Sequence, residues 1–321
     1  MNNTLIALDS GSQPPQITAI FIGVFAVLLL ASAIGQFLKR RHGAANDTVS
    51  NLNSRIYAWW LMSLVLLFAF WLGRIGTTVL FFLISFAALR EFMSLVYNRR
   101  SDYSSMVMCF YLLLPVQYYF VLDQWYGMFS IFIPVYGFLL LPIVASMSGD
   151  TASFLERTAK TQWMAMVCIF CLSHVPALLT LEIPDYAGRN LLLVVFLLLT
   201  VQSCDVFQYI WGKLLGRHAL SKQISPSKTV EGLAGGMLSA TAMGAALWWI
   251  TPFSPGEAAF VALVINTLGF FGGFVLSAIK RDRGIKDWGS MIEGHGGMLD
   301  RVDSISFAAP VFFHIVRYCW A

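Results

Sequence analysis

Residues 190–211 read NLLLVVFLLLTVQSCDVFQYIW, a run of 22 residues with one charged side chain, Asp205. An α-helix needs about 20 apolar residues to cross the hydrocarbon core of a bilayer, whereas a membrane strand shows about ten residues that alternate. Because only helices and closed barrels satisfy their backbone groups in lipid, this run predicts a transmembrane helix. A carboxylate within such a helix is costly in lipid, so Asp205 is predicted to face the interior of a bundle or a wet cavity.

The rest of the chain has the same apolar character. Of its 321 residues, 58% are hydrophobic, 15% aromatic and 12% charged, and the mean hydropathy is +0.70. Soluble domains are only about 45–50% apolar. Apolar spans are predicted over residues 17–38, 56–72, 75–97, 104–122, 128–147, 161–181, 190–211, 232–250, 256–279 and 303–320. We therefore predict an all-α fold, a polytopic integral membrane helical bundle with about ten transmembrane helices.

Basic residues are distributed unevenly between the predicted loops. With ten spans, the loops after the odd-numbered spans hold 18 of the 21 Lys and Arg residues, and Arg74, Arg189 and Arg317 lie on the other side. Since Lys and Arg accumulate in cytoplasmic loops, we expect both termini outside and the charged loops in the cytoplasm. The expected location is a bacterial inner (cytoplasmic) membrane. The net charge of +4 suits membrane lipids and phosphates, and the chain has no basic domain of the kind that binds nucleic acid.

The chemistry is concentrated in the second part of the chain. Residues 1–189 are predicted to form N-terminal transmembrane helices, whose sequence indicates no role beyond span formation. Residues 190–321 are predicted to form a C-terminal transmembrane catalytic region with cytoplasmic loops at 212–231 and 280–303. Both loops are expected on the same side of the membrane.

The first of these loops follows a helix with a polar face. Gln202, Asp205, Gln208 and Gly212 are spaced three or four residues apart, so they share one face of the helix. The alternative for Asp205 is a hydrogen bond to a neighbouring helix. Downstream, residues 225–229 read SPSKT and lead into another predicted helix. Free amides at a helix N-terminus bind phosphate, and a lysine beside them adds a point charge, so Ser225 and Lys228 are candidate phosphate ligands. The alternative is a capped helix with a topology-setting lysine.

The second loop is the most highly charged part of the chain. Residues 277–303 read SAIKRDRGIKDWGSMIEGHGGMLDRVD, with bases at Lys280, Arg281 and Lys286 and a flexible glycine turn at 294–297. Asp300 and Asp303 are three residues apart, so they are predicted to point the same way from the start of the last helix. Mg²⁺ is typically bound by one or two protein carboxylates together with substrate phosphates. The segment therefore predicts a site for a divalent cation and a polyphosphate. The alternative is a helix cap satisfied by Arg301, with the bases only setting topology.

These residues closely resemble the signature of the phosphatidate cytidylyltransferases, also called CDP-diacylglycerol synthases. The matching motifs are Ser277-x-x-Lys280-Arg281, Lys286-Asp287-x-Gly289 and His295-Gly296-Gly297-x-x-Asp300-Arg301-x-Asp303. The upstream segment 205–236 is similar to the same family. The resemblance implies transfer of CMP from CTP to phosphatidate, which yields CDP-diacylglycerol and pyrophosphate in phospholipid biosynthesis and requires Mg²⁺, with a second cation as an option.

The resemblance also implies roles for individual residues. Asp300, Asp303, Lys280 and Arg281 are expected to be catalytic. The implied metal ligands are Asp300 and Asp303, with Asp205 or Asp287 as a further ligand. The implied phosphate ligands are Lys228, Lys280, Arg281, Lys286 and Arg301, together with Ser225, and His295 is expected to bind phosphate or position the loop. The active site is expected to face the cytoplasm, where it reaches CTP and a lipid substrate.

One departure from the family pattern concerns the metal. The family commonly carries an acid after a glycine, four residues before the signature serine, and this chain has Gly272-Gly273 there. The chain is then expected to use Asp205 or Asp287 instead, to bind metal more weakly, to accept another lipid phosphate, or to be an inactive homologue.

Two further functions are compatible with the same residues. One is a related CTP-using enzyme that acts on an isoprenoid lipid, and the other, from a different class, is a lipid transporter. Transport is disfavoured because the charges cluster on one side rather than at mid-membrane. A homodimer is left open.

Overall fold

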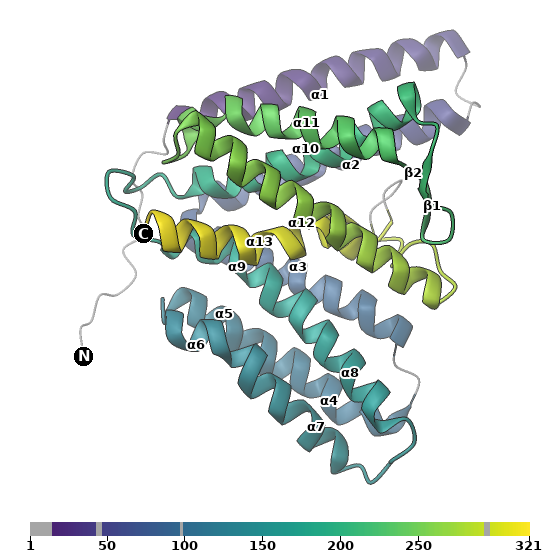
Figure 1. Ribbon diagram of the computed structural model, residues 1–321, viewed down its shortest axis with the longest axis vertical. Helices are drawn as coiled ribbons and strands as arrows, with labels where there is room; N and C mark the ends of the chain where they lie inside the picture. The colour runs from purple at the N-terminus through teal and green to yellow at the C-terminus, as the bar shows by residue number, and fades with distance from the viewer. Residues whose placement is uncertain (1–14, 43–46, 97–98, 292–295) are drawn as a thin grey trace.

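The computed structural model describes residues 15–42, 47–96, 99–291 and 296–321, and they form an all-α bundle (Figure 1). The longer helices are α1 (Pro15–His42), α2 (Asp47–Trp71), α3 (Gly73–Val96), α10 (Leu191–Leu215), α11 (Val230–Ala246), α12 (Pro255–Asp282) and α13 (Leu299–Cys319). The shorter ones are α4 (Tyr103–Met108), α5 (Leu114–Leu122), α6 (Tyr126–Ile131), α7 (Phe138–Ser146), α8 (Phe154–Ala165) and α9 (Leu172–Ala177). Among the described residues, the only strands are β1 (Ala219–Ser221) and β2 (Ser225–Thr229), which pair antiparallel.

The short helices combine into three membrane-length segments. π-helical turns at Cys109–Leu113, Phe132–Gly137 and Met166–Cys171 join α4 to α5, α6 to α7 and α8 to α9. With these joined, each of the ten predicted spans coincides with a helical segment. Within the described chain, eight segments are long and apolar enough to cross a membrane. The other two predicted spans are α11, which has 17 residues, and α13, whose first five residues include three charges. The prediction of an all-α polytopic membrane protein is confirmed.

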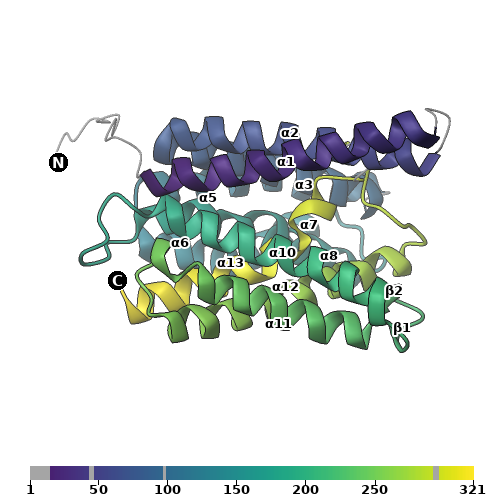
Figure 2. The same ribbon diagram turned by 90° about the horizontal axis from the view of Figure 1, so that it is seen from above.

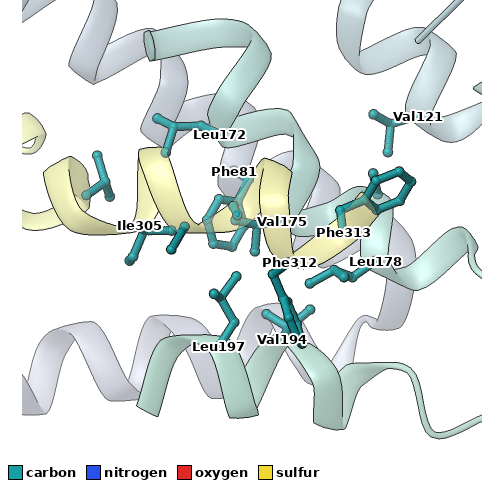
Figure 3. Close-up of a cluster of buried hydrophobic side chains, with 14 of the residues drawn as sticks. Phe81, Val121, Leu172, Val175, Leu178, Val194, Leu197, Ile305, Phe312 and Phe313 are labelled. Carbon is teal, nitrogen blue, oxygen red and sulfur yellow. The ribbon is translucent and has the colours of Figure 1, made fainter. Parts of the chain in front are cut away.

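Helix α13 lies in the middle of the bundle. It contacts α3, α9, α10 and α12, and Figure 3 shows its apolar side chains among those of its neighbours. The central cluster includes Ile305, Phe312 and Phe313 of α13, Val194 and Leu197 of α10, Phe81 of α3, and Leu172, Val175 and Leu178 from α9 and the turn after it. The last predicted span is therefore enclosed by protein, which explains how it tolerates charged residues at its start.

Helices α10 and α11 approach each other closely because α11 presents small residues. Gly232, Gly236, Ala240 and Gly244 recur every four residues and are all buried. A Cβ added at Gly236 would lie 2.4 Å from Cγ of Gln208 on α10. Small residues at this spacing let membrane helices pack with their backbones near one another. The stripe therefore fixes α11 against the polar face of α10.

The outer layers of the bundle differ from its centre. Figure 2 shows α1 and α2 along one edge of the molecule and α11 along the opposite edge. Helix α1 is mostly exposed and packs on α2, for example through a stack of Phe25 on Trp60. The β1–β2 hairpin and the loop after α12 lie at one end of the bundle, on the right in Figure 1. The two predicted chemical loops thus share one end of the molecule.

Candidate active site

The antiparallel packing of α12 and α13 aligns the two charged segments. Gly272 makes this packing possible, because a Cβ there would lie 2.7 Å from the carbonyl oxygen of Asp303. In this register Lys280 faces Asp300, and Gly273 faces Asp303. Close packing at a glycine therefore sets which side chains of α12 meet the acids of α13.

Asp300 is almost completely enclosed by donors. Its Oδ1 accepts a hydrogen bond from Nζ of Lys280 at 2.7 Å, and both side chains are buried. Its Oδ2 accepts from the backbone amides of Trp288 at 2.8 Å and Gly297 at 2.9 Å. A buried carboxylate with three donors is satisfied without a metal. Asp300 therefore holds the described ends of the loop between α12 and α13 in place, and its role as a metal ligand stays a prediction.

Asp303 and Asp205 approach the same hydroxyl. Oγ of Ser304 donates to Oδ2 of Asp205 at 3.0 Å and lies 3.4 Å from Oδ1 of Asp303. The amide of Ser304 donates to the same Asp303 oxygen at 2.7 Å. Lys280 pairs with Asp300, one helical turn before Asp303. Lys228 lies over the ring of Phe270, one turn from Gly273 on α12. The structure thus brings together two carboxylates and two ammonium groups from four elements, α10, α12, α13 and β2.

The predicted polar face of α10 is divided between two neighbouring helices. Gln202 donates to the carbonyl of Arg301 at 3.1 Å, and Asp205 meets Ser304, so these two side chains contact α13. Gln208 and Gly212 instead pack against the glycines of α11. Asp205 therefore makes an interhelical hydrogen bond, and the same carboxylate lies beside Asp303.

Gly273 opens onto this pair of carboxylates. A Cβ placed there would lie 3.4 Å from Oγ of Ser304 and 3.5 Å from Oδ2 of Asp303. These are ordinary contact distances, so a Cβ at this position would fit without a clash. The position where the family carries an acid therefore faces Asp303, and in this chain the third carboxylate is absent from it.

The hairpin and the end of α12 supply the basic residues. Nζ of Lys228, on β2, lies 5.0 Å from the centre of the Phe270 ring of α12, within the range of a cation–π interaction. Arg281 donates through Nε to the carbonyl of Ile224 at 3.3 Å and through Nη1 to that of Ile285 at 2.9 Å. Arg281 therefore ties the hairpin to the turn after α12. Ser225 begins β2 in the same hairpin.

Among the described residues, the remaining predicted ones form no hydrogen bond or ion pair with Asp205 or Asp303. Arg301 is partly buried, and its Nε has no partner among the described residues. Lys286 and Asp287 are both exposed on the loop after α12. His295 lies outside the described residues. In the part of the chain that the structure describes, no three His, Cys, Asp or Glu side chains form a metal-binding group. A cation here would depend on two carboxylates and on substrate oxygens.

Glu91 of α3 is a residue of this region that the sequence does not reveal. Its Oε1 accepts a hydrogen bond from the amide of Met298 at 2.8 Å, and its Oε2 accepts from that of Leu299 at 2.9 Å. The carboxylate is buried at the start of α13. The sequence signal is an acid near the end of the apolar run 75–97, beside Arg90. The sequence alone could not pair it with residues more than 200 positions away.

A second ionic cluster joins the loops before α4 and α8. Arg157 donates to the side chain of Asp150 at 2.5 Å and lies 3.4 Å from Asp102. Hydrogen bonds from the Ser101 hydroxyl, the Ala152 amide and Arg157, together with the Arg157 charge, lower the pKa of Asp150 to about 2. Because these charges are paired with one another, the cluster holds the two loops together.

Comparisons with known proteins identify the family of the chain. The model of the cytidylyltransferase family matches residues 53–319. The chain is 38% identical over 301 residues to the Escherichia coli (strain K12) protein "Uncharacterized protein YnbB", a match that covers 92% of this chain and 97% of that one. It is 28% identical over 271 residues to a phosphatidate cytidylyltransferase of Bacillus subtilis (strain 168), covering 83% and 98%. A phosphatidate cytidylyltransferase of Synechocystis sp. is 39% identical over 137 residues, covering 41% and 46%.

Proposed function

Because this chain belongs to the cytidylyltransferase family and is therefore a nucleotidyltransferase, we propose that it converts CTP and phosphatidate to CDP-diacylglycerol and pyrophosphate. The observation that carries the proposal is the convergence of Asp205 and Asp303 on Ser304, within electrostatic range of Lys228 and Lys280. Carboxylates beside ammonium groups suit a polyphosphate with a divalent cation. The relatives named phosphatidate cytidylyltransferase support phosphatidate as the lipid.

The position of the site suits one soluble and one membrane-bound substrate. The hairpin that carries Lys228 and the loop after α12 lie at one end of the bundle (Figure 1), while Asp205 lies within α10 and Asp303 near the start of α13. Most bases of the chain belong to the loops predicted on this side, which supports a cytoplasmic orientation in a bacterial inner membrane. CTP would then enter from the cytoplasm, while the lipid phosphate stays at the headgroup level of the bilayer.

The residues present fit one Mg²⁺ better than a larger metal centre. Asp205 and Asp303 are the two carboxylates that would hold it, and substrate phosphates would supply further oxygens. Asp300 fits less well because Lys280 and two amides already occupy its oxygens. When bound, the cation would neutralise charge on the phosphates of CTP. Asp287, on the loop after α12, is the remaining candidate for a second cation.

The chain's own groups support an in-line phosphoryl substitution. A phosphatidate oxygen attacks the α-phosphorus of CTP, a new P–O bond forms, and the bond to the β-phosphate oxygen breaks as pyrophosphate leaves. The attacking phosphate is already ionised, so no general base is required. Lys228, Lys286 and Arg301 would bind phosphates. Lys280 keeps Asp300 in place while its charge also reaches Asp303.

The test is a direct assay of the purified protein in detergent with labelled CTP, phosphatidate and Mg²⁺. Labelled CDP-diacylglycerol is expected from the wild type and not from Asp303→Ala. Labelled lipid formed equally well by Asp303→Ala would overturn the site. No labelled lipid, with an authentic phosphatidate cytidylyltransferase active in parallel, would overturn phosphatidate as the substrate.

The glycine at position 273 is a reason to test a second lipid in the same assay. Without an acid at that position, no side chain projects from residue 273 toward Asp303. An isoprenoid phosphate should therefore be offered in parallel with phosphatidate. Product from the isoprenoid lipid alone would assign the chain to a related CTP-dependent reaction, whereas product from neither lipid would indicate an inactive homologue.

A further inference from the structure

A buried acid of the N-terminal half of the chain, Glu91, contacts the signature loop. Glu91 lies on α3 and is 6% exposed. Its two carboxylate oxygens accept hydrogen bonds from the amides of Met298 and Leu299, at 2.8 and 2.9 Å. These amides belong to the first turn of α13, which has no side-chain cap of its own at Met298. Glu91 thus supplies from another helix the acceptors that a helix N-terminus normally obtains locally.

Both described ends of the loop between α12 and α13 close around this acid. A Cβ at Gly297 would lie 2.4 Å from Oε2 of Glu91, and one at Gly289 would lie 3.0 Å from its Oε1. Next to Glu91, the ring of Phe92 stacks on the buried ring of Trp288, with centroids 4.8 Å apart. Gly289 and Gly297 of the signature are therefore needed for the approach of Glu91, in addition to any approach to substrate.

Asp300 holds the same loop from the other side. It accepts from the amides of Trp288 and Gly297 and pairs with Lys280 of α12. Glu91 binds the next two amides along the chain, those of Met298 and Leu299. Two buried carboxylates, one from α3 and one from α13, thus fix four backbone amides. The start of α13, which carries Arg301 and leads to Asp303, is therefore tied to α3 and α12.

We propose that Glu91 is a positioning residue of the active site, which caps α13 from α3 and so sets the place of Asp303 beside Asp205. The proposal rests on the proposed function for its consequence in catalysis. The charge of Glu91 also complements the positive end of the α13 dipole, which a neutral acceptor would do less well. The position of Glu91 also gives the N-terminal helices a role, because α3 then supports the catalytic loop.

The experiment compares Glu91→Ala and Glu91→Gln with the wild type by hydrogen exchange of the substrate-free protein in detergent. The alanine variant leaves two buried amides without an acceptor, so peptides that cover Met298 and Leu299 should exchange faster. The glutamine variant keeps one carbonyl oxygen and should fall between the two. Unchanged protection of these peptides in Glu91→Ala would overturn the proposal, whatever reaction the protein catalyses.

Turnover provides the second measurement. In the lipid assay, kcat should fall roughly 10- to 100-fold in Glu91→Ala, as for other residues that orient a catalytic ligand, and Glu91→Gln should recover part of it. The midpoint of the Mg²⁺ titration should rise in the alanine variant, a change that loss of folded protein alone would not produce. If kcat fell equally in Glu91→Ala and Glu91→Gln and the midpoint of the Mg²⁺ titration did not change, Glu91 would have only a structural role.

A matched control exists at the far end of α12. Glu257 also accepts a backbone amide at a helix start, that of Ser254 at 2.7 Å, within a capping box. Glu257→Ala should leave both the Mg²⁺ midpoint and the exchange of residues 296–299 unchanged. The two proposals can fail separately. If the wild type forms no labelled lipid but the Glu91 variants show the predicted change in exchange, the proposed function is rejected and the role of Glu91 at the start of α13 is retained.

Discussion

Asp300 and Asp303 are one helical turn apart and have different surroundings. Asp300 is paired with Lys280 and bonded to two amides, whereas Asp303 meets a hydroxyl, its own neighbouring amide and a second carboxylate. The first environment satisfies a buried charge, and the second leaves carboxylate oxygens for a cation. The same residue type therefore serves structure at one position and chemistry at the next.

This contrast predicts opposite defects for two matched variants. Asp303→Asn should lower CMP transfer roughly 100-fold or more, with little change in thermal unfolding, because it removes a proposed cation ligand. Asp300→Asn should lower the free energy of unfolding by about 3–5 kcal/mol, because it leaves the buried Lys280 without its counter-charge. Thermal unfolding in detergent and the lipid assay measure the two effects. A stable but inactive Asp300→Asn would instead assign Asp300 to the metal.

Gly273 allows a gain-of-ligand experiment. A side chain there would start 3.4–3.5 Å from Ser304 and Asp303 and meet no backbone. Gly273→Asp should therefore add a carboxylate to the pair and lower the midpoint of the Mg²⁺ titration. Gly273→Asn has nearly the same shape without the charge and should not lower it. If both variants give the wild-type midpoint, the cation does not lie beside α12.

Sequence alone could predict some of these residues and not others. Asp205 stands out because charge is rare in an apolar run, whereas Lys228 and Asp303 stand out by their motifs, and the structure brings the three residues together. The spacing of Asp300 indicated a metal ligand equally well, since nothing local reveals that Lys280 and two loop amides would surround it. Glu91 could not be assigned for the same reason. Its partners are chosen by the packing of α3 on α13, which is a tertiary property.

At the scale of helices, the hydrophobic runs predicted where helices form. They did not predict the irregular turns within those helices. All ten predicted spans are helical, because apolar length determines helix formation in lipid. The three π-helical turns were not predicted, since their extra residue per turn has no reliable local signature. The hairpin of β1 and β2 was predicted only as a loop that enters a helix. Thr229 does cap α11, through a hydrogen bond from the amide of Gly232 at 3.1 Å.

The small-residue stripe of α11 predicts that the site depends on helix spacing. In Gly236→Ala, the added methyl would lie 2.4 Å from Cγ and 2.8 Å from the backbone nitrogen of Gln208, so α10 and α11 must move apart. The cost should be about 1–3 kcal/mol of unfolding free energy. Gly23→Ala on exposed α1, where nothing lies within 4 Å, is the control and should be neutral or slightly stabilising. Equal thermal unfolding of the two variants would contradict close packing as the reason for the glycine.

At the scale of the whole molecule, the number of crossings decides the sides of the membrane on which the hairpin, the loop after α12 and the C-terminus lie. Eight segments of the described chain are apolar enough to cross by composition, and α11 and α13 complete the predicted ten. Both are packed against neighbouring helices, so their glycines and charges need not face lipid. If both cross, the two termini lie on one side and the hairpin and the loop after α12 on the other. If only one crosses, the C-terminus changes sides.

Cysteine labelling of intact cells distinguishes these topologies. Cys319 is the one exposed cysteine of the described chain, while the other four are buried or partly buried. In a Cys319→Ser background, Ala321→Cys should react with an impermeant maleimide from outside, because the C-terminus is predicted there. Lys222→Cys, exposed between β1 and β2, should react only after the cells are lysed. Labelling of Lys222→Cys in intact cells would put the carboxylate pair on the outer face, away from cytoplasmic CTP. The proposed reaction would then lack its nucleotide, whatever the geometry of Asp205 and Asp303.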